Sequence, residues 1–232
     1  MVDHPISRDP GLGPLASAWL ASAGRVVVEP RAASTVMLVR DGARGPEVYV
    51  QRRVATMAFA PSTVVFPGGG VDPADSALPV STPGLAELAA AMGVSVAAAA
   101  PYAAAAVREV EEECGVQLSV ADLRGRAHWV TPEFEPRRYD TWILAAGMPA
   151  GQEATGTTTE SDHSAWVRPA ALLERHTAGE VRMLPPTVVS LEQLAGFGSA
   201  ADFLADRPVV AKVLPVLVLG DDGTPVLRTE MP

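Results

Sequence analysis

Residues 108–116 read REVEEECGV, and this short stretch carries the strongest structural signal in the chain. At 3.6 residues per turn, Val110 and Cys114 fall on one apolar helix face, in line with the alanines that precede them. Gly115 follows at once, and glycine is common just past the C-terminus of a helix. Pro101 suits the first helical position. We therefore expect an amphipathic helix that begins at Pro101 and ends at Cys114.

A second face of this helix carries three carboxylates, Glu109, Glu112 and Glu113, which are spaced so that all three lie within reach of one another. They repel one another, and the end of a helix is already the negative pole of its dipole. Arg108, four residues before Glu112, offsets only part of this charge. Carboxylate oxygens are the ligands that Mg²⁺ and Mn²⁺ prefer, so an external divalent cation is the expected partner. Taken alone, the run is better explained as a solvated acidic helix end.

A glycine-rich turn lies upstream, where residues 66–75 read FPGGGVDPAD after a short run of β-forming residues. Three consecutive glycines let the backbone approach a metal ion or a phosphate closely and present a carbonyl or an amide to it. By itself, a glycine-rich segment after a strand is usually only a turn. Here, however, the turn precedes residues 108–116, and the two segments must be considered together.

Together the two segments resemble the signature of the Nudix hydrolases, G-x5-E-x7-R-E-U-x-E-E-x-G-U, where U is a bulky aliphatic residue. Gly69 matches the first glycine, Asp75 stands where glutamate is usual, and residues 108–116 match the second half without a gap. Counted from Asp75, the signature places its arginine at position 83, whereas this chain has it at 108, 25 positions further on. The intervening residues are rich in alanine and predict further helix.

The resemblance implies an α+β fold, namely a Nudix-type α/β/α sandwich with a mixed central sheet. It also implies a helical insertion at about residues 76–100, within the signature, which we call the box. We expect residues 1–24 to form an N-terminal extension and residues 25–232 to form the Nudix domain. A helix is expected to begin at Pro83, after Thr82 as its N-cap. The β-branched and alternating runs predict strands at 25–28, 33–40, 47–52, 63–66, 126–130, 139–145, 165–167, 213–219 and 225–228.

The activity implied by the resemblance is hydrolysis of a diphosphate linked to another group, with Mg²⁺ or Mn²⁺ as the cofactor. Glu109, Glu113 and the Gly69 carbonyl are the expected metal ligands. Glu112 is expected to be either a further ligand or the base that accepts the proton of the attacking water. Arg108 is expected to hold a box carboxylate in place, with a surface ion pair as the alternative.

The substrate is less clearly indicated than the reaction. A helical insertion at this point of the signature is also found in a Nudix subgroup that includes coenzyme A diphosphatases. This chain further resembles that subgroup at residues 129–132, 137–141 and 184–187. Coenzyme A or an acyl-CoA is therefore the favoured substrate, and a dinucleotide, an ADP-sugar or NADH is the alternative. The chain could also be a non-catalytic nucleotide-binding module, but such modules generally lose box carboxylates.

Several further side chains are candidates for contact with the substrate. Arginine matches phosphate geometry, although each arginine taken singly is better explained as a surface ion pair. A carboxylate from the polar loop before Trp166 could complete the site, or could simply be solvated. These candidates are Arg52, Arg53, Arg137 and Arg138, with Glu160 and Asp162 as the loop carboxylates.

The composition of the chain limits the classes of molecule that it is expected to bind. Its 232 residues carry a formal net charge of −9, which argues against binding to a nucleic acid polymer or an anionic membrane. Residues 88–107 are uncharged but mostly alanine and broken by proline and glycine, so we expect two packed helices there and no membrane span. A single cysteine excludes an internal disulfide and favours a reducing, cytoplasmic setting. A small-molecule diphosphate is the expected partner, and a homodimer is compatible with the sequence.

Overall fold

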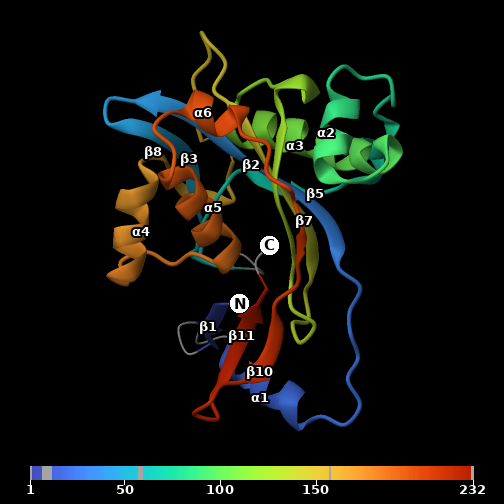
Figure 1. Ribbon diagram of the computed structural model, residues 1–232, viewed down its shortest axis with the longest axis vertical. Helices are drawn as coiled ribbons and strands as arrows, with labels where there is room; N and C mark the ends of the chain where they lie inside the picture. The colour runs from blue at the N-terminus through green and yellow to red at the C-terminus, as the bar shows by residue number, and fades with distance from the viewer. Residues whose placement is uncertain (1, 7–11, 57–59, 157, 231–232) are drawn as a thin grey trace.

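The computed structural model describes residues 2–6, 12–56, 60–156 and 158–230 (Figure 1). The strands are β1 (Val2–Pro5), β2 (Arg31–Gly42), β3 (Gly45–Arg53), β4 (Val64–Val65), β5 (Gly68–Gly70), β6 (Arg124–Val130), β7 (Tyr139–Gly147), β8 (Ser161–Val167), β9 (Lys212–Val213), β10 (Val216–Leu219) and β11 (Pro225–Thr229). The helices are α1 (Leu12–Ala21), α2 (Leu85–Met92), α3 (Val96–Cys114), α4 (Pro169–Thr177), α5 (Pro185–Ala195) and α6 (Ala200–Ala205), with short 3₁₀ helices at Pro73–Ala77 and Val120–Asp122.

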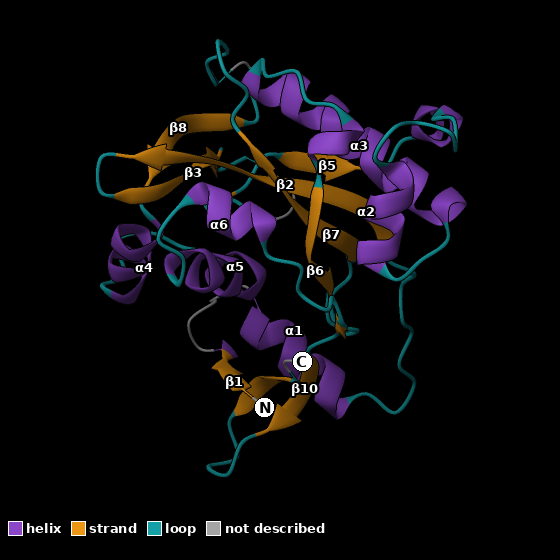
Figure 2. Cartoon of the chain, turned by 45° about the horizontal axis from the view of Figure 1, so that its top comes forward, coloured by secondary structure: helices purple, strands orange, loops and turns teal. Residues whose placement is uncertain are grey.

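The large sheet is mixed, as expected. Its strand order is β4-β3-β2-β7-β6-β9, with β5 also paired to β2 and β8 to β3. The β2–β7 and β6–β9 pairs are parallel, and the others are antiparallel. Helices cover both faces, with α2 and α3 on one side and α4, α5 and α6 on the other (Figure 2). The predicted α/β/α sandwich is therefore confirmed.

Alternation along the central strands explains the two layers. On β7, Trp142 and Leu144 belong to the core that packs against α2 and α3. Ile143 and Ala145 point the other way, into the core shared with α5 and α6. Because successive side chains of a strand face opposite sides of the sheet, one continuous apolar strand supplies both cores.

The main helix begins five residues earlier than the sequence indicated. Ser95 is the N-cap, and its hydroxyl accepts a hydrogen bond from the Ala98 N–H, so α3 starts at Val96 and Pro101 lies inside it. A proline there removes one helical hydrogen bond, and the buried alanines of α3 offset the loss by packing into the core. The predicted end at Cys114 is confirmed, with Gly115 in the left-handed region at φ 68°.

Helix α2 packs on α3 within the segment predicted as an insertion. It starts at Leu85 and not at Pro83, because Gly84 takes the N-cap position with φ 82°. An added Cβ at Gly84 would lie 2.3 Å from the Ala121 Cα, so this close approach requires glycine. In the described part of the chain, no single helix is long and apolar enough to cross a membrane. The α2–α3 pair meets that test of length and composition only when joined across a bend of 106°.

A second, smaller sheet joins the two ends of the chain. Its order is β1-β11-β10, with α1 beside it (Figure 1). The strand predicted at 213–219 is divided into β9 and β10, and β10 pairs antiparallel with β11, the strand predicted at 225–228. Residues 25–28, predicted as a strand, lie instead in the segment connecting α1 to β2, where Val26 is 83% exposed. The division of the chain at residue 24 stays a prediction.

The single cysteine provides a test of the α3 core. Cys114 is fully buried, its Sγ accepts a hydrogen bond from Gln51 Nε2 at 3.6 Å, and burial raises its pKa to about 12. We expect the folded protein to react with a disulfide reagent at pH 8 about 10³-fold more slowly than an exposed thiol, because so little thiolate forms. Absorbance of the released thiol measures this, and the protein in denaturant is the control. Rapid labelling of the folded protein would contradict the packing of α3.

Candidate active site

The site forms where a glycine-rich strand meets the end of α3. β3 and β5 pair with different segments of β2: β3 pairs with residues 39–42, and β5 pairs with residues 33–35. The short β5 therefore lies in the sheet beside α3, against which it packs. Gly68 has φ 153°, and an added Cβ there would lie 2.4 Å from the Ser34 carbonyl oxygen. The glycines thus let the strand approach both β2 and the acidic helix.

Arg108 connects the glycine turn to the acidic face of α3. Its Nη2 donates to the Gly70 carbonyl at 2.9 Å and to Asp75 Oδ2 at 3.0 Å. Its Nη1 donates to Glu109 Oε1 at 2.8 Å and to Glu112 Oε2 at 3.2 Å. One guanidinium therefore holds the loop and two box carboxylates together, which is more than a surface ion pair.

Asp75 is the buried partner of that arginine. Its side chain is 6% exposed, and it also accepts a hydrogen bond from the Asp72 N–H at 2.7 Å. Burial acts to raise the pKa of Asp75, but the hydrogen bonds from Arg108 and Asp72 and the charge of Arg108 outweigh it, so the pKa lies below its usual value. An ionised Asp75 therefore fixes Arg108 from behind, on the side away from the cleft.

Burial raises the pKa values of two carboxyl groups of the site, Glu113 and Glu109. Glu113 is 8% exposed and accepts a hydrogen bond from the Gly68 N–H at 2.9 Å. Burial raises its pKa to about 7, with the charges of Glu109 and Glu160 acting in the same direction. Burial likewise raises the pKa of Glu109. A bound cation would reverse these shifts, because it favours the ionised carboxylates.

The donor set fits a hard divalent cation by its chemistry, since it consists of carboxylate oxygens beside backbone carbonyls. Within the described residues, however, no three acidic, histidine or cysteine side chains are gathered closely enough to hold a metal ion. Glu109 and Glu112 are turned to Arg108, and Glu113 is turned to Gly68. Glu112 is the most accessible of the three, with 59% of its side chain exposed.

A single cleft of about 760 Å³ contains these groups. Gly69, Glu109, Glu112 and Glu113 line it, and so do Arg53 and Glu160. Arg53 is the one basic side chain among the described lining residues, and its Nε is buried without a hydrogen-bond partner among the described groups. The structure therefore brings Arg53 and Glu160 to the acidic helix end.

The other three predicted arginines lie outside the described lining of the cleft. Arg52 forms an ion pair with Asp162, Nε to Oδ1 at 2.7 Å, on the exposed surface. Arg138 is buried and donates to the Thr131 and Val28 carbonyls at 3.0 and 2.7 Å. These contacts give Arg138 a structural task in joining β7 to the segment that follows α1.

Several lining residues had little or no signal in the sequence. Thr131 and Pro132, and Leu184 to Thr187, lie in segments that had been singled out only by similarity. Leu12, Pro215 and Leu227 also line the cleft. No local pattern indicates these last three, because they reach the cleft only through the pairing of the two chain ends.

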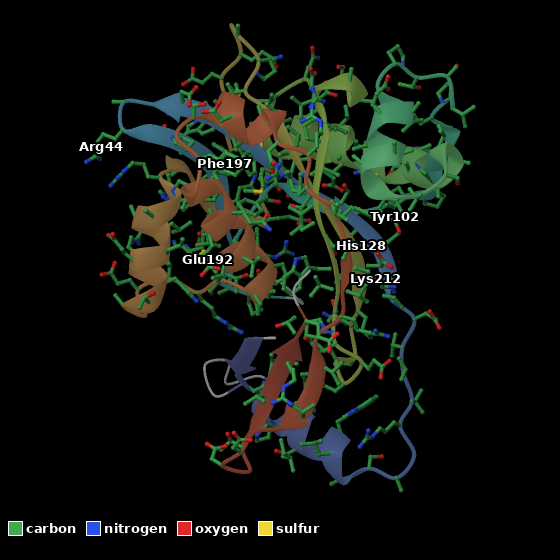
Figure 3. The ribbon with its side chains drawn as sticks, viewed as in Figure 1. Arg44, Tyr102, His128, Glu192, Phe197 and Lys212 are labelled. Atoms are coloured by element: carbon green, nitrogen blue, oxygen red, sulfur yellow. The ribbon has the colours of Figure 1, made fainter. Side chains whose placement is uncertain are left out.

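A separate polar cluster lies on the opposite face of the sheet. His128 Nε2 is 2.5 Å from Asp140 Oδ1, and the His128 ring stacks on Trp142 with 4.1 Å between centroids. Lys212 Nζ lies 3.7 Å from Asp140 Oδ2. Figure 3 shows Tyr102, His128 and Lys212 together beside β7. This cluster joins β9 to β6 and β7, and its members are not among the described residues that line the cleft.

Comparison with known proteins agrees with this geometry. The NUDIX domain family matches residues 95–186, which include the second half of the box but not the glycine turn. A NUDIX hydrolase from Alicyclobacillus acidocaldarius has a similar crystal structure, with a TM-score of 0.67 and 24% identity over 79% of this chain and 99% of that one. No curated protein matches the sequence.

Two further crystal structures are more distant. A MutT protein from Bacillus halodurans has a TM-score of 0.48 and 12% identity over 87% of this chain and 99% of that one. A MutT NUDIX hydrolase from Burkholderia pseudomallei has a TM-score of 0.46 and 17% identity over 71% and 98%. At these scores the two likenesses carry no argument of their own.

Residues 95–186 thus match the NUDIX domain family, and the fold of the chain is similar to that of a NUDIX hydrolase.

Proposed function

We propose that this chain is a Mg²⁺- or Mn²⁺-dependent diphosphatase that cleaves the diphosphate linkage of a nucleotide-type small molecule. The observation that carries the proposal is the contact between Gly68–Gly70 and the glutamates of α3, inside a cleft of about 760 Å³. All three glutamates of the box are present, which favours catalysis over nucleotide binding alone.

We assign the metal ligands to Glu109, Glu113 and the Gly69 carbonyl, with Glu112 as a further ligand or as the general base. A divalent cation bound there would neutralise the phosphates and lower the pKa of a bound water. Arg108 acts as a positioning residue, because it orients Glu109 and Glu112 and is itself held by Asp75. Glu112, the most exposed of the three, can reach a water molecule without disturbing the core.

Electrostatics explains why a cation is needed for the substrate to bind. The chain has a net charge of −9, and the described lining of the cleft contains five glutamates against Arg53 alone. A diphosphate would be repelled by such a surface in the absence of metal ions. Arg53, whose Nε has no hydrogen-bond partner within the part of the chain that the structure describes, is the residue we assign to contact a phosphate oxygen.

We propose coenzyme A or an acyl-CoA as the substrate, on the sequence similarity to the coenzyme A diphosphatase subgroup. A dinucleotide, an ADP-sugar or NADH is the alternative within the same reaction class. The cytoplasmic location and the homodimer stay predictions.

Purified protein incubated with Mg²⁺ and a panel of these compounds tests the proposal, with products identified by mass spectrometry. We expect two monophosphate products from each compound that is cleaved, and no cleavage in the presence of EDTA. Release of 4′-phosphopantetheine with 3′,5′-ADP would identify coenzyme A as a substrate. Tight nucleotide binding without turnover of any compound would support the non-catalytic module instead.

The close approach of Gly69 to the helix gives a prediction about metal binding. An added Cβ at this position would lie 2.3 Å from Glu109 Oε1, the end of a flexible side chain, so Gly69→Ala should displace the carboxylate and leave the fold intact. We expect hydrolysis to slow by about 10²-fold with little change in Tm. Gly125→Ala is the control, since its added carbon would lie 3.6 Å from the nearest atom. Unchanged turnover in Gly69→Ala would contradict a role for Glu109 at this place.

A further inference from the structure

The cleft is much longer than the group of acidic residues at its one end. On β7, the alternate residues Tyr139, Thr141 and Ile143 all line it. Ile143 pairs with Thr35, which is level with Gly68, whereas Tyr139 pairs with Arg31, beyond the end of β5. Four residues of strand span about 13 Å, so the cleft extends well past the glycine turn.

The far end lies between two separate hydrophobic clusters. Trp129, which pairs with Thr141, belongs to the core of the large sheet. Leu227, with Leu12 packed against it, belongs to the cluster of the small sheet. These three residues line the same cleft, so the cleft separates the two clusters at this end. Apolar side chains therefore face each other across a gap that the protein itself does not fill.

The distribution of charged residues along the cleft also favours an apolar ligand at the far end. Arg53 and four of the five lining glutamates come from the glycine-turn end, from β3, α3 or the loop before β8. At the far end, Glu135 is the only charged side chain among the described lining residues. The others there are mostly apolar and include Leu12, Trp129, Pro132, Pro215 and Leu227. A second phosphate would find no cationic side chain in this part of the described surface, whereas an uncharged apolar group would remove exposed hydrocarbon from water.

We propose that the far end is a specificity subsite for an uncharged, apolar group joined to the diphosphate, and that α1 and β11 form its outer wall. The proposal rests on the proposed function for the diphosphate itself. One continuous cleft contains both the box glutamates and the apolar wall, so a group joined to a diphosphate at the glutamates can extend to that wall. Its volume of about 760 Å³ is that of a pocket for a ligand much larger than a diphosphate. Leu12 is the specificity-determining residue that can be changed most safely, being half-buried at the start of α1.

The test compares acetyl-CoA with octanoyl-CoA, which differ only in the length of an apolar chain. We expect kcat/KM to be at least about tenfold higher for octanoyl-CoA, because burial of each methylene is favourable. Leu12→Glu should remove most of this preference. Leu15→Glu is the matched control: it introduces the same charge on the same helix, at a residue that is 38% exposed and does not line the described cleft, and it should keep the preference.

A phosphate-free probe keeps this proposal separate from the proposed function. Octanoyl-pantetheine should bind the wild-type protein and the Leu15→Glu variant in calorimetry, and should bind Leu12→Glu about tenfold more weakly. Equal hydrolysis of the two acyl-CoA compounds, with no binding of the probe, would overturn the apolar subsite and leave the diphosphatase intact. Binding of the probe without turnover of any diphosphate would support the subsite and overturn the proposed function.

Discussion

Replacement of Glu112 by glutamine is expected to slow diphosphate hydrolysis by about 10²–10⁴-fold, the usual contribution of a positioned general base. The amide keeps the size of the side chain but cannot accept a proton or bind a cation as a carboxylate does. Because 59% of the Glu112 side chain is exposed and it accepts a hydrogen bond from Arg108, itself 27% exposed, the change should not disturb the core. Steady-state kinetics at saturating Mg²⁺ would measure the loss in kcat.

The neighbouring residue provides a matched control. Glu111 lies on the same turn of α3, is exposed, and accepts a hydrogen bond from Gln117 Nε2 at 3.1 Å on the side away from the cleft lining. Glu111→Gln makes the same chemical change to the net charge and should keep wild-type kcat and Tm. If Glu112→Gln turned over at the wild-type rate, Glu112 would have no part in the chemistry.

Replacement of Arg108 by methionine is expected to affect both stability and activity. Asp75, 6% exposed, would lose the cation that faces it, and an unpaired buried carboxylate costs about 2–4 kcal/mol. For a domain of this size we expect Tm to fall by roughly 5–15 °C. Glu109 and Glu112 would lose their common donor, so kcat/KM should fall by about 10²-fold or more. Thermal unfolding and kinetics measure the two effects separately.

A double variant distinguishes positioning from stability. Asp75→Asn in the Arg108→Met background removes the buried charge, so Tm should recover in large part while activity stays low. Recovery of activity together with Tm would mean that Arg108 acts only through the fold. A kcat/KM in Arg108→Met equal to that of the wild-type protein would remove Arg108 from the site altogether.

The parts of the fold that follow local rules could be predicted from the sequence. The end of α3 at Cys114 follows from Gly115, and the approach of the glycine turn to the acidic face was implied by the resemblance of the two segments to the Nudix signature, although the spacing between them is 25 residues too long. The start of α3 was placed too late, because the capping by Ser95 and the packing of buried alanines outweigh the usual preference of Pro101 for a first turn. The start of such a helix is determined by tertiary packing, which a local sequence pattern does not reveal.

The chemical end of the cleft could also be predicted, but its other end could not. Glu109, Glu112 and Glu113 are close in sequence, so helix periodicity alone brings them together. Arg138 looked like a candidate for substrate contact, yet its donors bind backbone carbonyls in the interior. Leu12 and Leu227 are separated by most of the chain, and their meeting depends on strand pairing between the chain ends that no short-range rule specifies.

The pairing of β1 with β11 has a consequence for the order of events during biosynthesis. The box helix ends at Cys114, and β11 is translated roughly 110 residues later, which at 5–20 residues per second is on the order of 5–20 s. For that interval a nascent polypeptide would already carry the acidic helix while α1 and β1 still lacked their partner strand. On the ribosome, the acidic helix would therefore be complete before β11, the strand that we propose as part of the wall of the apolar subsite.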